Sequence, residues 1–487
     1  MNRTIKNYYG GKWQETLGQD FFTVESPFFR GYTIKVSNSD RLDMGDCFAE
    51  AKRGSERCAE LSLEERCDIL TSAAQKFEFT DAEVEHLVKM QGAPISAARQ
   101  HVEYAGELLA KAAEAVELHH GSVAGALGRS IGGHGYELLV PRKYITSAFI
   151  PPNDPAEAAF VFAHTVMSGS AVILKPSQQE PYFAHKLAQL LTECGYPAGG
   201  LNVINWDTGD QSRVHMKQGM IYDTDSLVFM GDLKTAVSML RSNTELWNFC
   251  VFAAGKSKAI IDDGADLVQA ADNLTYSSMD WTNSCVATKA AVVVGKDNAE
   301  ALAEHLAQRF KRLTVGNPLG AKTQIGYVSS EILEDMEKAM SNLRDFGAVD
   351  FVLPFQRVGE HQMRPILAIA SPSDPELIFF KEELPYTLAI VPVNSFEEAT
   401  NFVNRSAVHL GERFVMATSL YAGPKTFSDF AASESRKYAK LRQLSTGMIF
   451  YNRPSLNLSP YLNHQGINLT RFLSRPLTIV DSEGGKQ

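Results

Sequence analysis

The chain has 487 residues, a length that predicts roughly two to four domains, each large enough to bury its own core. Hydrophobic residues make up 44% and charged residues 21%, values close to those of folded globular proteins, so most of the chain is expected to fold. With 47 basic and 57 acidic residues the net charge is −10, which argues against nucleic acid or anionic lipid as a partner.

The cysteines and the first residues indicate the compartment. The six cysteines are far apart and form no CxxC pair, so neither a zinc ribbon nor a dense disulfide framework is predicted, and we expect reduced thiols. The start of the chain has no apolar stretch like that of a signal peptide, and no apolar run approaches the ~20 residues that span a bilayer. We therefore expect a cytoplasmic protein with no membrane partner.

The first third of the chain is predicted to be mainly helical. Residues 45–120 carry apolar residues at helical spacing, and Ser62 followed by Glu65 forms a capping box. A glycine-rich stretch at 121–135 ends this pattern, and the run YELLVPRKYITSAFI that follows is rich in β-forming residues. This region indicates a hairpin or a domain boundary.

Helices and strands then alternate in two successive sets. In the first, from 153 to 250, AVILKP and LNVIN are the predicted strands; the second begins near 258 with KAIID. Such alternation predicts parallel sheets with crossover helices, and hence an α/β fold with two units in tandem. The last stretch, 454–487, contains one β-like run, RPLTIV, and fits an arm or edge strand better than a domain.

Generic motifs identify no function. There is no GxGxxG, and the AAGKS at 253–257 fails as a P-loop because the first required glycine falls on Cys250. The twelve histidines include no HExxH, and the adjacent His119 and His120 point to different helix faces, so no metal site is predicted.

A series of short strings in a fixed order is more informative, because together they resemble the aldehyde dehydrogenase superfamily over nearly the whole chain. No single string would suffice, but eight or more collinear matches make a chance resemblance improbable. The strings are YYGGKW near the start, PPNDP at 151–155, LKPSQQEP at 174–181, GYPAGGLNVIN, FMGD at 229–232, AAGKSKAIIDDGADL, NSCVAT, VGNPL at 315–319, EEL at 382–384 and STGMIFYNRP near the end.

The resemblance implies an aldehyde dehydrogenase-like fold: two tandem parallel-sheet α/β domains and a small β element for oligomerisation. We predict a cofactor-binding domain at 1–123 and 151–250 and a catalytic domain at 251–440. The oligomerisation hairpin and arm would be 124–150 and 454–487. The resemblance also implies a homodimer or homotetramer.

The resemblance assigns a nucleophile and an oxyanion donor. Cys285 would attack a carbonyl carbon, since a thiolate is the strongest side-chain nucleophile near neutral pH. Asn153 would donate its side-chain amide to the oxyanion formed by that attack, with the Cys285 backbone N–H as second donor, each worth about 3 kcal/mol. Without the resemblance, Cys285 would more often be an inert thiol and Asn153 a turn residue.

The resemblance also implies NAD or NADP as cofactor. Lys175 would contact the adenosine ribose at a strand end. NAD-preferring members commonly carry Glu three residues later; here Gln178 removes its repulsion of a 2′-phosphate, so dual use is plausible. Asp232 replaces the usual Ser beside the pyrophosphate, which is unfavourable unless it points away. The predicted cofactor-binding residues are Lys175, Ser177, Gln178, Gly231, Asp232 and Glu383.

The most informative departure from the family pattern is Phe252. Hydrolytic members usually carry at this position a glutamate that activates water to cleave the acyl-enzyme thioester. Phenylalanine cannot accept a proton, and loss of a general base costs about 10² to 10⁴ in rate. The same gap occurs in acylating branches, where coenzyme A or another thiol resolves the thioester, and the NSCVATKAAVVV loop is also closer to those branches.

We therefore predict an NAD(P)-dependent aldehyde dehydrogenase that is acylating, or that reduces acyl thioesters, with coenzyme A as an expected co-substrate. One alternative is a hydrolytic enzyme that makes a carboxylic acid, and another is an inactive family member acting as a binding subunit. The substrate is a small aldehyde or acyl thioester whose identity is not readable. His164, Met167 and Trp281 lie near it by family position, but each could equally be a packing residue.

Overall fold

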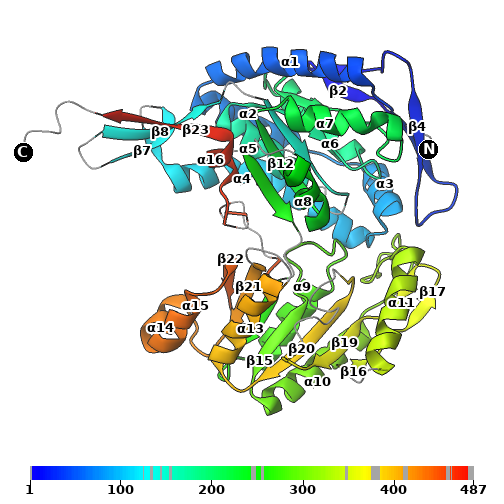
Figure 1. Cartoon of the computed structure of the whole chain (residues 1–487), viewed down its shortest axis with the longest axis vertical. Helices are drawn as coiled ribbons and strands as arrows, with labels where there is room; N and C mark the ends of the chain where they lie inside the picture. Colours follow the sequence, from blue (N-terminus) through cyan, green and yellow to red (C-terminus); the bar gives the residue numbers. More distant parts are fainter. Residues whose placement is uncertain are drawn as a thin grey trace, which may run out of the picture.

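The computed structural model describes residues 3–123, 125–131, 135–142, 145–152, 156–242, 248–253, 257–345, 349–373, 384–409, 415–456, 461, 463–464 and 466–480. These residues form two α/β lobes, one above the other in Figure 1, and a thin sheet that projects sideways from the upper lobe. The two tandem parallel-sheet lobes confirm the predicted α/β fold class.

The upper lobe is built on a seven-stranded sheet with the order β13-β12-β9-β10-β11-β2-β3. The first five strands in this order run parallel, and β2 and β3 are antiparallel at one edge. β10 has the sequence AVILK and is buried throughout, as expected for a parallel strand covered on both faces. The strands are β2 (Asn7–Tyr9), β3 (Lys12–Gln14), β9 (Ile145–Phe149), β10 (Ala171–Lys175), β11 (Leu201–Val203), β12 (Ser226–Gly231) and β13 (Phe249–Ala253).

Helices cover both faces of this sheet. The predicted capping box is confirmed at the start of α2, where the Ser62 side chain accepts from the backbone of Glu65 and the Glu65 side chain accepts in return. α5 is buried almost all round and packs against α4. The helices are α1 (Arg41–Glu60), α2 (Leu63–Lys76), α3 (Asp81–Gln91), α4 (Ile95–His120), α5 (Ala156–Ser168), α6 (Tyr182–Glu193), α7 (Val214–Tyr222) and α8 (Leu233–Ser242). A small sheet of β1 (Arg3–Ile5), β5 (Thr33–Ser37) and β4 (Phe21–Glu25) lies at the N-terminus.

The lower lobe repeats this design with the order β16-β19-β20-β15-β14-β21-β22, in which only β16 is antiparallel. Its strands are β14 (Lys258–Ile261), β15 (Ala290–Val294), β16 (Val349–Leu353), β19 (Ile366–Ala370), β20 (Thr387–Val393), β21 (Val415–Tyr421) and β22 (Thr446–Tyr451), with β17 (Arg357–Gly359) and β18 (Gln362–Met363) as a separate pair. Its helices are α9 (Leu267–Ser278), α10 (Lys296–Arg312), α11 (Ser330–Asp345), α13 (Phe396–His409), α14 (Phe427–Ser433) and α15 (Ser435–Leu441).

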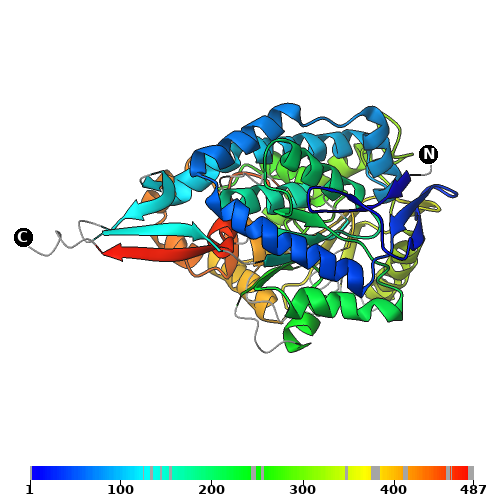
Figure 2. The same cartoon turned by 90° about the horizontal axis from the view of Figure 1, so that it is seen from above.

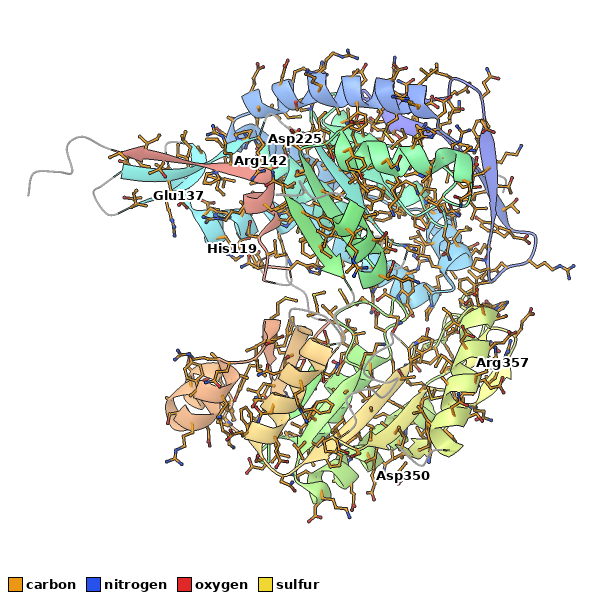
Figure 3. The ribbon with its side chains drawn as sticks, in the orientation of Figure 1. His119, Glu137, Arg142, Asp225, Asp350 and Arg357 are labelled. Carbon is orange, nitrogen blue, oxygen red and sulfur yellow. The ribbon has the colours of Figure 1, made fainter. Side chains whose placement is uncertain are left out.

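The projecting sheet joins two distant parts of the chain (Figures 1 and 2). β23 (Ser474–Val480) pairs antiparallel with β8 (Gly135–Pro141), followed by β7 (Ala126–Ser130) and β6 (Ser122–Val123). α16 (Leu469–Leu473) links β23 to the lobe and packs on α5. Glu137, labelled in Figure 3, faces the guanidinium groups of Arg129 at 3.4 Å and Arg471 at 3.5 Å.

One boundary differs from the sequence-based division. The sequence groups 145–150 with the hairpin, but in the structure β9 lies inside the seven-stranded sheet, between β12 and β10. Its run ITSAF has a buried centre, which fits a central strand and not an exposed hairpin. The use of the projecting sheet in oligomerisation stays a prediction.

Candidate active site and cofactor cleft

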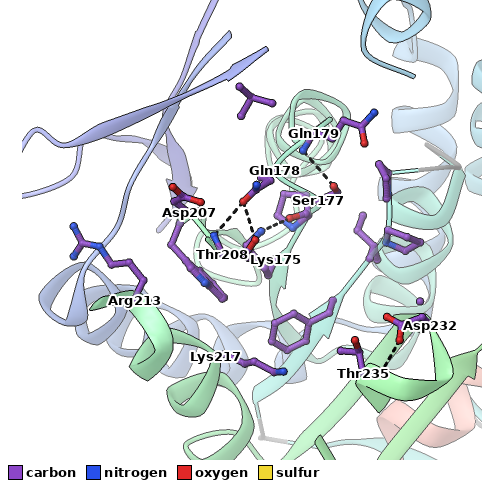
Figure 4. Close-up of a pocket in the computed structure, with 18 of the residues that line it drawn as sticks. Lys175, Ser177, Gln178, Gln179, Asp207, Thr208, Arg213, Lys217, Asp232 and Thr235 are labelled. Atoms are coloured by element: carbon purple, nitrogen blue, oxygen red, sulfur yellow. Dashed lines mark hydrogen bonds between the residues drawn. The ribbon is translucent and has the colours of Figure 1, made fainter. Parts of the chain in front are cut away.

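Five of the six predicted cofactor-binding residues line a single cavity of about 790 Å³ in the upper lobe. The cavity lies at the carboxyl ends of β9, β10 and β12, where open α/β sheets bind ligands (Figure 4). The five are Lys175, Ser177, Gln178, Gly231 and Asp232. Glu383, the sixth, lies outside the described residues.

Lys175 ends β10 and is almost fully buried, with 4% of its surface exposed. Its ammonium donates to the carbonyl of Pro176 at 2.6 Å and lies 5.1 Å from the centre of the Trp206 ring. Burial lowers the pKa of Lys175 to about 7, and the carboxylate of Asp207 opposes this shift only in part. A negative group that enters the cleft, such as a phosphate, would therefore favour the protonated form of Lys175.

Gln178 is held in one orientation by Thr208, which follows β11 (Figure 4). The Thr208 backbone N–H donates to Gln178 Oε1 at 3.1 Å, and the Thr208 hydroxyl donates to the same oxygen at 2.9 Å. These two bonds use both lone pairs of the carbonyl oxygen, so the side chain meets a ligand with its Nε2 donor. A donor suits an acceptor such as phosphate, whereas a glutamate at the same place would accept from ribose hydroxyls.

The carboxylate of Asp232 has a structural partner. Its Oδ1 accepts from the backbone N–H of Thr235 at 2.7 Å, in the first turn of α8 (Figure 4). A carboxylate in this position satisfies an otherwise unpaired N–H and matches the positive end of the helix dipole. Next to it, a Cβ at Gly231 would come within 2.9 Å of the Phe229 ring. A carboxylate beside a phosphate would be unfavourable, but here Asp232 points towards its own helix and caps it.

The cavity also contains two cations that the sequence reasoning missed, Arg213 and Lys217. Arg213 pairs with Asp20 at 2.9 Å and with Asp210 at 3.6 Å. Lys217 lies on α7 and extends into the cavity in Figure 4. The available signal was their place in the helical segment 211–222 that follows β11 and borders the carboxyl edge of a parallel sheet.

Cys285 lies in the loop between α9 and β15 and is half-buried. Two residues earlier, Asn283 has a left-handed backbone with φ of 49°, which Asn tolerates better than most residues. The buried ammonium of Lys289 donates to the Asn283 side chain and to the carbonyl of Leu384 at 3.0 Å. These contacts fix the backbone on both sides of the thiol.

The nucleophile loop is tied to neighbouring segments by two serines. Ser257, at the start of β14, donates to the Cys285 carbonyl at 2.8 Å and accepts from the Ala417 backbone at 3.1 Å. Ser455, after β22, donates to the carbonyl of Val286. Asn153, the predicted oxyanion donor, lies outside the described residues, so its role stays a prediction.

Phe252 lies near the end of β13, beside Met230 of β12, and only 3% of it is exposed. Its ring centre is 6.2 Å from that of Phe160 on α5 and 4.9 Å from that of His464 in the C-terminal segment. The position that carries glutamate in hydrolytic members is thus occupied by an aromatic side chain in an aromatic group.

The three residues expected near the substrate have different surroundings. Met167 is fully buried in the core of the upper lobe, and His164 bonds through Nδ1 to the Thr470 hydroxyl at 2.7 Å. Trp281 is half-buried and meets the edge of His101, with ring centres 5.4 Å apart. Met167 and His164 are therefore packing residues, and Trp281 packs against an apolar cluster of each lobe.

The model of the aldehyde dehydrogenase family matches residues 13–422. The chain belongs to the aldehyde dehydrogenase family. It is an oxidoreductase that acts on aldehydes. Among its relatives is a betaine aldehyde dehydrogenase of Vibrio vulnificus, 29% identical over 361 residues, which are 72% of this chain and 71% of the relative.

Solved structures of the family have the same fold. An NAD-dependent aldehyde dehydrogenase from Sinorhizobium meliloti matches with a TM-score of 0.80 at 18% identity, over 100% of this chain and 96% of that one. An NADP-dependent enzyme of E. coli matches with a TM-score of 0.80 at 18% identity, over 98% of both chains. In the described part of this family member, no helix is long and apolar enough to cross a membrane, and no group of metal-ligating side chains gathers.

Proposed function

We propose that this family member is an NAD(P)-dependent acylating aldehyde dehydrogenase, in which a thiol such as coenzyme A releases the acyl group from Cys285. The observation that carries the proposal is Phe252, buried where hydrolytic members have their base. An aromatic side chain can neither polarise water nor accept its proton. A thiol is the better acceptor for this site, because a thiolate forms near neutral pH whereas hydroxide does not.

The chemistry begins with addition of Cys285 Sγ to the aldehyde carbon. Asn153 and the Cys285 backbone N–H would donate to the oxygen that becomes negative, a stabilisation of about 3 kcal/mol per donor. A nicotinamide cofactor held by Lys175 and Gln178 would supply the acceptor for the hydride. The protein's part is to hold Sγ in place, and the bonds from Ser257 and Lys289 to the loop do so. The reverse sequence would reduce an acyl thioester to an aldehyde.

The cofactor cleft fits a dinucleotide with or without a 2′-phosphate. Lys175 and the Gln178 Nε2 group are donors at the end of β10, and Asp232 is turned into its own helix. The ammonium of Lys217 adds positive charge on α7. We therefore propose that NADP is accepted at least as well as NAD, since no carboxylate stands at position 178 to repel the phosphate.

We further propose a homodimer or homotetramer assembled through the projecting sheet. This sheet exposes apolar side chains at its end, with Ile479 44% and Val480 78% exposed, and Tyr136 pairs with Ile479 across the strands. A second copy of the chain would cover them. The free state of the six cysteines agrees with the predicted cytoplasmic location.

The test is a product assay on a panel of aliphatic and aromatic aldehydes with NAD or NADP, with and without coenzyme A. The proposal expects reduced cofactor and a coenzyme A thioester to form together, and little free acid without the thiol. Rapid free-acid formation without a thiol would instead identify a hydrolytic enzyme. Absence of both cofactor binding and Cys285 labelling by an aldehyde-like electrophile would identify a binding subunit.

A further inference from the structure

The aromatic group around Phe252 contains a histidine that is partly exposed. His464, in the C-terminal segment, lies with its ring centre 4.9 Å from that of Phe252 and 5.3 Å from that of Phe160. We infer that His464 is the general base that takes the proton from the thiol which resolves the acyl group on Cys285. This inference rests on the proposed function and names the residue that does the work of the missing glutamate.

The other histidine of this group is unsuited to the role. His164 is 8% exposed, and its Nδ1 is engaged with the Thr470 hydroxyl at 2.7 Å. Burial, with a smaller contribution from neighbouring histidines, lowers the pKa of His164 to about 3. Such an imidazole binds a proton poorly at neutral pH, whereas the His464 ring is partly exposed, so that it can exchange a proton with water.

Short stretches of chain connect this aromatic group with the nucleophile loop. Ser257, which bonds to the Cys285 carbonyl at 2.8 Å, comes five residues after Phe252, and five residues span at most about 18 Å. The C-terminal segment contacts both places: Ser455 bonds to the Val286 carbonyl next to Cys285, and His464 packs on Phe252. Described residues of the C-terminal stretch therefore contact both the nucleophile loop and the Phe252 ring.

The replacement of glutamate by Phe252 is compatible with an imidazole base. The two rings meet at an interplanar angle of 64°, an edge arrangement that favours a fixed position of the imidazole. Phenylalanine carries no charge and cannot compete for the proton. The titratable neighbours of His164 on α5 are His464 and, at the end of α4, His119 and His120.

The step balances without another reactant. The thiol gives its proton to a ring nitrogen of His464, and its sulfur attacks the acyl carbon on Cys285. The bond from Cys285 Sγ to that carbon breaks, the new thioester leaves, and Cys285 returns as thiolate. The proton on His464 then passes to solvent.

The experiment uses p-nitrophenyl acetate, which acetylates a reactive thiol without an aldehyde or a cofactor. The burst of p-nitrophenol measures acetylation of Cys285, and the steady rate with coenzyme A measures its removal. In His464→Gln we expect an unchanged burst and a steady rate about 100-fold lower, the usual contribution of a general base. In His464→Ala, added imidazole should restore part of the steady rate.

The matched control is His119→Gln. His119, labelled in Figure 3, contacts the same C-terminal segment through its Nε2, 2.7 Å from the Tyr461 carbonyl, and is exposed. If the histidines only hold this segment, both variants slow alike. A base role predicts a change of less than about twofold in His119→Gln.

The pH profile separates a base from a packing residue. In the unaltered protein the steady rate should follow the ionisation of a basic side chain as well as that of the thiol, whereas in His464→Gln it should follow only the thiol's own ionisation, near ~8.5. An unchanged rate and profile in His464→Gln would overturn the inference and leave the proposed function standing. Failure of p-nitrophenyl acetate to acylate Cys285 would overturn both. If water clears the acetyl group at full speed without thiol, the proposed function fails, and a slow His464→Gln would still identify the base.

Discussion

The cofactor cleft and the surroundings of Phe252 lie in the same lobe and differ in kind. In the cleft, polar groups are held by short local bonds: Lys175 on Pro176, Gln178 on Thr208, and Asp232 on its own helix. Around Phe252, which is itself buried, the neighbouring side chains are aromatic. The difference indicates that the chain keeps the groups for binding a dinucleotide but has lost the carboxylate that hydrolysis requires.

Removal of the nucleophile should have the largest effect, because it should abolish aldehyde oxidation and leave cofactor binding intact. Cys285→Ser replaces the thiol with a hydroxyl, which remains protonated near neutral pH. We expect aldehyde oxidation to fall by at least ~10³-fold. Cofactor affinity, measured by fluorescence titration, should stay within about twofold, because the cleft lies in the other lobe. If aldehyde oxidation and cofactor affinity were lost together, the thiol would also be needed for the cleft to bind the cofactor.

A carboxylate placed at position 252 should make the protein hydrolyse its acyl group. Phe252→Glu is expected to raise free-acid formation about tenfold or more without thiol, since a positioned base contributes about 10² to 10⁴. The gain is limited because burial raises the pKa of a carboxyl, and unfolding should become easier by about 1–3 kcal/mol. Phe252→Gln has a similar polarity without a proton acceptor, so an equal gain there would contradict the account.

The cleft can be altered in the opposite direction with Gln178→Glu. The new carboxylate would repel a 2′-phosphate and accept from ribose hydroxyls, so the ratio of NADP to NAD affinity should fall about tenfold. Thr208→Val is the matched change, because it removes one of the two bonds that orient Gln178 without adding charge. An unchanged affinity ratio in Gln178→Glu would show that this side chain does not face the ribose.

A smaller effect is expected from pH through Lys175, whose pKa is lowered to about 7 by burial. Above that pH the amine of the free protein is neutral, and a bound 2′-phosphate draws a proton back onto it. The affinity for NADP should therefore weaken about tenfold from pH 7 to 9, whereas the affinity for NAD changes less. The two affinities can be measured by calorimetric titration as a function of pH. If they change equally with pH, or if the stronger dependence for NADP disappears in Lys217→Met, the 2′-phosphate does not bind at Lys175.

Local patterns in the sequence predicted much of the fold. The β10, α6 and β11 alternation, and the Ser62 cap of α2, follow from residues near each other in the chain. The contacts that distinguish this protein are long-range: Gln178 meets Thr208 from another strand end, and Phe252 meets His464 from the C-terminal segment. No periodicity or short motif encodes such pairs, because they depend on how the lobes and the segment pack.

The central claim is that a thiol, and not water, clears the acyl group from Cys285. The most direct measurement isolates the acetylated protein by rapid desalting after p-nitrophenyl acetate and follows the modified Cys285 by intact-mass spectrometry. The account predicts that the acetyl group persists in buffer and disappears within one turnover time when coenzyme A is added. Equally fast loss in buffer alone would contradict it.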